Sequence, residues 1–128
     1  MNRTILLSAV IFGFLAVILG AFGAHGLKDM IDAASLESYN TGVRYQMYHA
    51  LLLLWVGTMT QLSSGQKKWI YYCLGTGTVL FSFSIYLLAT NSLTSFDFSS
   101  IGFITPIGGS FLIIGWGLIG YRVFRHLV

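Results

Sequence analysis

The chain has 128 residues, of which 55% are hydrophobic and only 9% are charged, whereas a soluble domain carries about 25% charged residues. A chain this short cannot bury so many apolar residues in a core, so much of its surface must face lipid. The 7 basic residues are scattered in ones and twos, which excludes the dense basic face that nucleic-acid binding needs. The single cysteine, Cys73, excludes an internal disulfide.

Four apolar stretches predict an all-α membrane protein with four transmembrane helices in one compact bundle. Each stretch approaches the ~20 residues needed to cross ~30 Å of hydrocarbon. Helices are expected because every backbone amide inside lipid needs an internal partner. We expect a single membrane domain over residues 1–128, with helices at about residues 4–24, 35–62, 69–91 and 101–124.

The first stretch follows Arg3 and is too long for the core of a signal peptide, which has 7–15 residues, so a retained helix is favoured. After it, Leu27, Met30 and Ile31 recur at helical spacing and predict a short interfacial turn. Ser35 is expected to cap the second helix, whose first turns lie outside the lipid core.

The later connections are polar. Residues Ser63–Lys68 read as a short turn, and residues Ser92–Ser100 form a longer connection that carries Asp97. Thr105–Pro106 admits two readings. The pair either starts the fourth helix, with proline in its first turn, or kinks a longer helix.

The basic residues predict the orientation. With four crossings, one side holds five of the seven: Arg3, Lys67, Lys68, Arg122 and Arg125. The other side holds Lys28, Arg44 and all four acidic residues. Because cytoplasmic loops of membrane proteins are rich in Lys and Arg, both termini are expected in the cytoplasm. The expected location is the bacterial cytoplasmic (inner) membrane, crossed several times; a mitochondrial membrane is the less favoured alternative.

Small residues predict where helices approach closely. Gly13 and Gly20 lie on the first helix, and Gly108 and Gly109 lie on the fourth. Glycine at such spacing lets helix backbones pack in lipid. A compact bundle is the favoured interpretation, and a glycine-lined contact between copies, giving a homo-oligomer, is the alternative.

Ionisable residues within a membrane are costly and suggest a functional site. The predicted topology brings a polar cluster to the outer side, and it is the candidate site for a ligand or partner: His25, Arg44, Tyr45, Tyr48, His49, Asp97 and Thr105. The favoured interpretation is structural, with Arg44 reaching water or pairing with Asp97, Asp29 or Asp32. Replacement of Arg44 by Ala is expected to destabilise the bundle or abolish function, because a partner carboxylate or helix end would be left unpaired. The alternative is that the cluster binds a lipid headgroup, an anion, a proton or a membrane-protein partner.

Catalysis and cofactor binding have little support in the sequence. Two candidate histidines without a third ligand or a haem attachment motif predict neither a metal nor a cofactor. Nucleophile-elbow, phosphate-loop and zinc-protease motifs are absent. We therefore expect a protein that is not an enzyme and has no catalytic residues, with the lipid bilayer as its main partner.

Four segments together resemble the YgdD/YwdK-like family of small bacterial inner-membrane proteins, which has a mitochondrial transmembrane relative. They are residues 20–26 (GAFGAHG), 42–51 (GVRYQMYHAL), 77–82 (GTVLFS) and 105–109 (TPIGG). The resemblance implies four membrane helices and a domain of unknown function, without a reaction or substrate. The expected role is a non-enzymatic accessory, lipid-binding or membrane-stabilising protein, and the alternative is a small transporter or channel component for an ion, proton or small solute.

Overall fold

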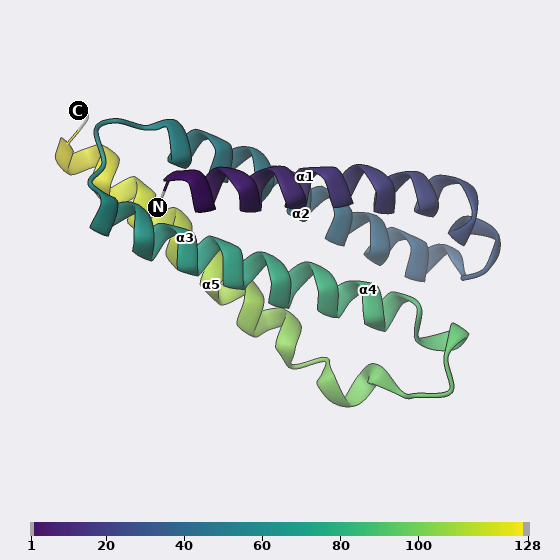
Figure 1. Cartoon of the computed structure of the whole chain (residues 1–128). Helices are drawn as coiled ribbons and strands as arrows, with labels where there is room; N and C mark the ends of the chain where they lie inside the picture. The colour runs from purple at the N-terminus through teal and green to yellow at the C-terminus, as the bar shows by residue number, and fades with distance from the viewer. Residues whose placement is uncertain (1, 127–128) are drawn as a thin grey trace.

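The computed structural model describes residues 2–126, and within them the chain forms helices and no strands. In chain order the elements are α1 (Asn2–His25), η1 (Leu27–Asp29), α2 (Ala33–Thr58), α3 (Ser64–Thr78), η2 (Val79–Phe83), α4 (Ser84–Ala89), η3 (Asn91–Leu93), η4 (Phe98–Ile101) and α5 (Ile104–His126). The elements α3, η2 and α4 follow one another without a break and form one long rod (Figure 1). The predicted all-α fold class is confirmed.

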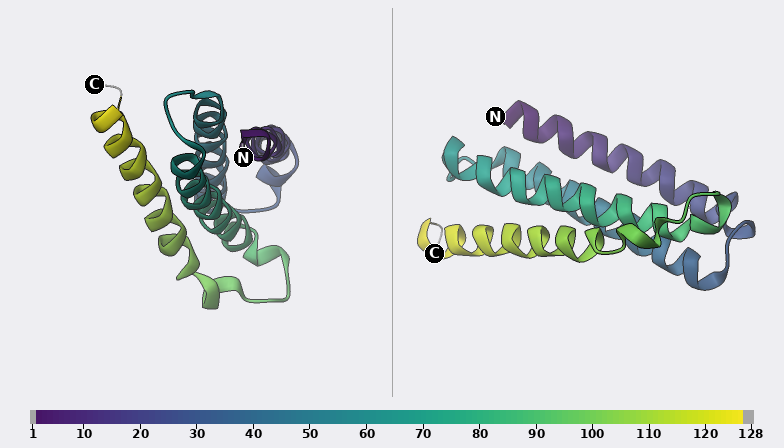
Figure 2. Two further views of the ribbon diagram at one scale, coloured as in Figure 1. Left: turned by 60° about the vertical axis from the view of Figure 1, so that its left-hand side comes forward. Right: turned by 90° about the horizontal axis from the view of Figure 1, so that it is seen from below.

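The rods pack as two antiparallel pairs. Helix α2 runs back along α1, and α5 runs back along α3 (Figure 1). The beginning of α1, the α2–α3 connection and the end of α5 lie at one end of the molecule, which we call the terminal end (Figures 1 and 2). The α1–α2 and α4–α5 connections lie at the opposite end, which we call the loop end.

The distribution of side chains differs from that in a soluble protein, because apolar side chains cover the outside as well as the core. Large apolar side chains are exposed along the long helices, among them Phe14 at 65% and Ile113 at 73%. Polar side chains such as Gln46 and Ser82 are fully buried. Exposed apolar patches of this extent mark a surface that contacts lipid, so the fold is that of an integral membrane protein.

Among residues 2–126, three segments are long and apolar enough to cross a membrane: Asn2–His25, Ser64–Ala89 and Phe98–Arg125. Helix α2 is equally long, with 26 residues, but it is less apolar. It is less apolar because it carries the polar residues Arg44, Gln46 and His49. The side chains of Gln46 and His49 are buried in the bundle.

The starts of two helices differ from the sequence-based expectation. Asp32, not Ser35, caps α2, because its Oδ1 accepts a hydrogen bond from the backbone N–H of Ser35 at 2.7 Å. Helix α3 begins at Ser64, behind a capping box formed by Ser63 and Gln66. Its strong cap starts the helix earlier, so Lys67 lies within the helix and not in a turn.

The start of α5 distinguishes the two readings of Thr105–Pro106. Helix α5 begins at Ile104, so the pair lies in its first turn and does not kink a longer helix. Proline is tolerated there because its missing N–H has no intrahelical partner to lose. The predicted interfacial turn after the first helix corresponds to the 3-10 turn η1, in which Leu27 is buried.

The glycines singled out for helix packing differ in how closely a neighbour approaches. A Cβ on Gly108 would lie 2.4 Å from the backbone N of Phe81. At Gly13, Gly20 and Gly109 the nearest atom would be a side-chain atom at 3.7, 3.3 and 3.7 Å. Backbone contact at Gly108 occurs where α5 crosses η2.

The π-helical turn η2 supplies the other unusual feature of this crossing. A single π turn inserted in an α-helix rotates the residues around it and frees backbone groups. Here Ser82 is fully buried, and its Oγ donates to the carbonyl oxygen of Gly42 at 2.8 Å. The turn therefore ties the α3–α4 rod to α2.

Candidate functional site

The structure does not gather the predicted polar cluster in one place. His25 is the last residue of α1 and is exposed at the loop end. His49 lies 16 residues into α2, about 24 Å along the helix at 1.5 Å per residue. Its neighbour Gln46 donates to the carbonyl oxygen of Phe12, near the middle of α1. His49 is therefore in the middle of the bundle and not near the outer end.

Arg44 has a different partner from those considered in the sequence. Its Nη2 lies 3.4 Å from Oε1 of Glu37 and donates to Oγ1 of Thr41 at 3.0 Å. Residues three, four and seven positions apart share one helix face, so the guanidinium extends along α2 toward the loop end. This geometry fits a long side chain that carries its charge toward the membrane surface.

Asp97 is held within its own connection. Its Oδ1 accepts the backbone N–H of Ser99 at 3.0 Å and the side-chain amide of Asn91 at 3.2 Å. These bonds favour the ionised form, with the Ser99 backbone bond first, and hold the pKa of Asp97 below its ordinary value. The contribution of the bonds is full at neutral pH and is lost as the pH falls through the lowered pKa.

We expect Arg44→Ala to change the free energy of unfolding by less than about 1 kcal/mol, because exposed ion pairs contribute that little. The side chains of Arg44 and Glu37 are 47% and 75% exposed. This loss of stability is smaller than the destabilisation of the bundle that the sequence led us to expect for Arg44→Ala. Thermal unfolding in detergent micelles measures it, with Glu37→Ala as the matched control. A much larger loss for Arg44→Ala alone would indicate a further partner of the guanidinium.

His49 is fixed in one neutral tautomer by two hydrogen bonds. The indole N–H of Trp116, which can only donate, points at Nε2 of His49 at 3.1 Å. Nε2 is therefore the acceptor, and Nδ1 carries the proton that it donates to the carbonyl oxygen of Tyr45 at 2.6 Å. The imidazole joins α2 to α5 while both of its nitrogens are engaged.

Aromatic rings surround this imidazole. The ring of Tyr45 stacks on it at an interplanar angle of 23°, and the ring of Trp116 meets it edge-on at 78°. The pocket beside it has a volume of about 300 Å³ and is lined by Tyr45, His49, Phe81, Gly109, Leu112, Ile113 and Trp116. Such a lining fits an apolar chain better than a polar solute. Tyr48, which directly precedes His49 in α2, is exposed.

Thr105 joins two elements and does not face an open site. Its Oγ1 lies 2.6 Å from Oγ of Ser84, so the first turn of α5 is hydrogen-bonded to the first turn of α4. Hydrogen bonds of this kind are common between helices in lipid. Within the described residues, Thr105 is placed as a helix-joining side chain.

Sequence reasoning missed the central polar network. Gln46 is fully buried, its Nε2 donates to the carbonyl oxygen of Phe12 at 2.8 Å, and its Oε1 accepts from the hydroxyl of Tyr86 at 2.7 Å. One amide therefore connects α1, α2 and α4. On the same side of α2, Tyr39 donates to the carbonyl oxygen of Leu19 at 2.6 Å.

A signal for this network was present in the sequence. The buried residues of α2 recur at alternating steps of three and four: Tyr39, Gly42, Gln46, His49 and Leu53. This spacing marks the inward face of a helix. Among the described residues, every buried side-chain N or O atom has a hydrogen-bond partner, and no three metal-ligating side chains lie together.

The buried polar network, the lipid-facing apolar surface and the long helices define a polytopic α-helical membrane protein. A family model for a protein of unknown function, DUF423, matches residues 19–109, so the chain belongs to this family. It is 38% identical to the UPF0382 membrane protein YwdK of Bacillus subtilis over 98% of this chain and 99% of that protein. It is also 38% identical to the UPF0382 inner membrane protein YgdD of Escherichia coli, over 92% and 87% of the two chains.

A UPF0382 membrane protein of Staphylococcus saprophyticus is 40% identical over 87% of this chain and 88% of its own length. No solved structure matches the chain. The resemblance inferred from the four sequence segments is confirmed. Together with the apolar helices, the relatives make this chain a multi-pass protein of the bacterial cytoplasmic membrane.

Proposed function

We propose that the chain is a non-enzymatic accessory protein that crosses the cytoplasmic membrane four times and stabilises it or binds a lipid or membrane-protein partner. The observation that carries this proposal is the closed interior. The buried polar side chains bond to one another or to backbone carbonyls, and a network without free groups specifies one rigid arrangement.

The four crossings and the cytoplasmic termini are supported by the antiparallel pairing and by the charges. Helix α2 lies along the whole of α1 and has a similar length, so a membrane that encloses α1 also encloses α2. The terminal end carries five of the seven Lys and Arg residues. The loop end carries all four acidic residues. The positive-inside rule then assigns the terminal end to the cytoplasm.

The predicted cluster divides between two roles in this proposal. The exposed members His25, Arg44 and Asp97 are the groups available to a headgroup or partner on the outer side, whereas Tyr48 is exposed at the depth of His49, away from the outer end. His49 and Thr105 hold helices together through the hydrogen bonds described above, and the ring of Tyr45 packs against Phe81 of η2 with the ring centroids 5.0 Å apart.

The alternative, a small transporter or channel component, is favoured by one observation, the polar inward face of α2. Flux of protons, potassium ions and small solutes into vesicles that contain the purified protein distinguishes the two. The accessory role predicts flux no greater than in protein-free vesicles. Sustained flux that scales with protein content would contradict that role.

We expect opposite labelling of two cysteines placed at the two ends, in a Cys73→Ala background. Ser95 and Gly65 are exposed, and no atom approaches within 4 Å of a Cβ at Gly65, so neither substitution disturbs packing. A membrane-impermeant maleimide is expected to label Ser95→Cys in intact cells and Gly65→Cys only after permeabilisation. The reverse pattern, or equal labelling of both in intact cells, would contradict the proposed orientation.

A further inference from the structure

Lys67 is a buried cation without an acidic partner. It is only 3% exposed, and its Nζ donates to Oδ1 of Asn2 at 3.1 Å and lies 3.5 Å from the carbonyl oxygen of Gly57. Buried charges in proteins are normally paired with an opposite charge. Here the acidic residues all belong to the loop end: Asp29, Asp32, Glu37 and Asp97. The ammonium group is therefore held by neutral oxygens alone within the described residues.

A second cation shares the space next to Lys67. The side chain of Arg3 is exposed in the first turn of α1 and makes no hydrogen bond or ion pair within residues 2–126. The two cations line one pocket of about 340 Å³, together with Asn2, Leu62 and Ser64. The pocket combines two positive charges with amide and hydroxyl groups, a composition that suits a phosphate.

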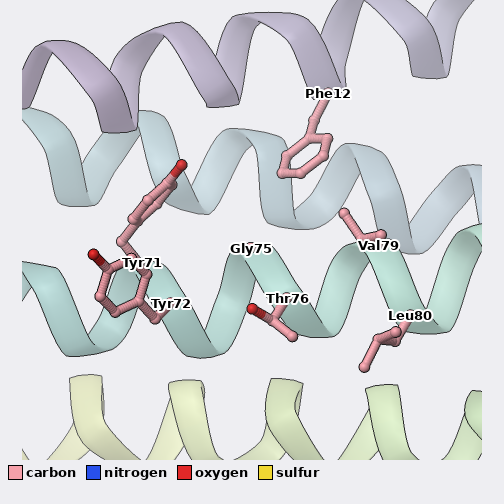
Figure 3. A pocket seen from close by; sticks show the side chains of 7 residues that line it. All are labelled: Phe12, Tyr71, Tyr72, Gly75, Thr76, Val79 and Leu80. Carbon is pink, nitrogen blue, oxygen red and sulfur yellow. The ribbon is translucent and has the colours of Figure 1, made fainter.

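An apolar groove follows the same pair of helices deeper into the bundle. Its volume is also about 340 Å³, and its lining includes Phe12 of α1 and Gly75 and Val79 on the α3 side (Figure 3). Between the pocket and the groove, the hydroxyl of Tyr71 reaches from α3 to Oγ of Ser8 on α1 at 2.7 Å. We call the pocket and groove together the α1–α3 seam.

The two parts of the seam lie in line. Their lining residues on the α3 side recur every three or four positions, which places them on one helix face: Ser64, Lys67, Tyr71, Gly75 and Val79. From Lys67 to Val79 the rod rises about 18 Å at 1.5 Å per residue. Half of a ~30 Å hydrocarbon core is about 15 Å, so the seam runs from a membrane surface to about the depth of one leaflet.

We propose that the α1–α3 seam binds one anionic phospholipid of the cytoplasmic leaflet. The phosphate accepts hydrogen bonds from Arg3 and lies in the positive field of Lys67, while one acyl chain lies against Phe12, Gly75 and Val79. A zwitterionic lipid would bring its own ammonium group toward these two cations, so the site prefers a lipid with net negative charge. This inference rests on the proposed lipid-binding role and on the proposed orientation, and it names the lipid class.

Native mass spectrometry of the detergent-solubilised full chain, offered equal amounts of phosphatidylglycerol and phosphatidylcholine, tests the proposal. The unchanged protein is expected to retain one phosphatidylglycerol in preference to phosphatidylcholine. Arg3→Gln is expected to lower this preference about fivefold, the effect of one basic residue at an anionic surface. Arg122→Gln is the matched control, since it removes a charge from the same end but outside the seam.

A second variant fills the apolar groove of the α1–α3 seam. Gly75 has room for a Cβ, whose nearest neighbour is a Tyr71 ring carbon at 3.7 Å, and the side chain of Gly75→Leu would occupy the groove. This variant is expected to lose both lipids while the bundle keeps its thermal stability. Equal retention of the two lipids by the unchanged protein, an equal loss for Arg122→Gln, or full binding by Gly75→Leu would overturn the proposal. None of these outcomes alters the vesicle flux that tests the accessory role.

Discussion

Gly108→Ala is expected to lower the free energy of unfolding by about 1–3 kcal/mol, the usual range for overpacking a well-packed contact. The added Cβ would lie 2.4 Å from the backbone N of Phe81 and 2.8 Å from the backbone C of Leu80. Backbone atoms cannot move aside as a flexible side chain can, so α5 must separate from η2. Reversible unfolding in mixed detergent micelles measures the change.

Gly109→Ala is the matched control because it makes the same chemical change one residue further along α5. Its Cβ would lie 3.7 Å from Cδ2 of Phe81, an ordinary contact. Alanine in place of glycine in a helix contributes up to about 1 kcal/mol through helix propensity. Gly109→Ala should therefore match or exceed the stability of the unchanged protein. Equal losses for both variants would mean that the crossing at Gly108 is not close-packed.

The contrast between these two glycines shows what the sequence predicts and what it leaves out. Glycines at a small-residue spacing predicted that helices approach one another, because only short side chains permit it. Which of two adjacent glycines meets a backbone depends on the rotation of α5 about its own axis. The backbone that Gly108 meets belongs to the π turn at Val79–Phe83, which leaves no signature in hydrophobic spacing.

The candidate site was predicted less well than the helices. Apolar runs of ~20 residues are a strong signal because the bilayer fixes their length. The depth of a side chain is a weaker signal, since it depends on where the helix begins. Asp32 starts α2 ahead of the expected cap, and the hydrogen bond from Gln46 to Phe12 fixes its height against α1. His49 consequently lies in the middle of the bundle.

Lys67 was misplaced for a related reason. A run of polar residues before Trp69 read as a turn, but Ser63 and Gln66 cap a helix that already includes Lys67. Once the residue is helical, its side chain projects toward α1 and reaches Asn2. The partner is 65 positions away in the chain, and a contact over such a separation cannot be read from local pattern.

Gln46→Leu is expected to lower the free energy of unfolding by about 1–2 kcal/mol. The substitution keeps the volume similar but leaves the buried Tyr86 hydroxyl without the acceptor that lies 2.7 Å away. An orphaned buried polar group costs about 1–3 kcal/mol. Interhelical hydrogen bonds in lipid average only about 0.6 kcal/mol, since the unfolded chain also finds partners. Gln46 makes two interhelical hydrogen bonds of this modest strength. We therefore expect a loss in the lower half of the range of about 1–3 kcal/mol.

A double-mutant cycle with Tyr86→Phe separates the hydrogen bond from the packing. If the bond is the cause, Gln46→Leu with Tyr86→Phe should be destabilised by less than the sum of the two single changes, because the double variant leaves neither group orphaned. Gln61→Leu provides the control, since this exposed glutamine lies in the α2–α3 connection outside the helices. Additive single effects would mean that the amide and the hydroxyl do not interact, and the network joining α1, α2 and α4 would then not rest on Gln46.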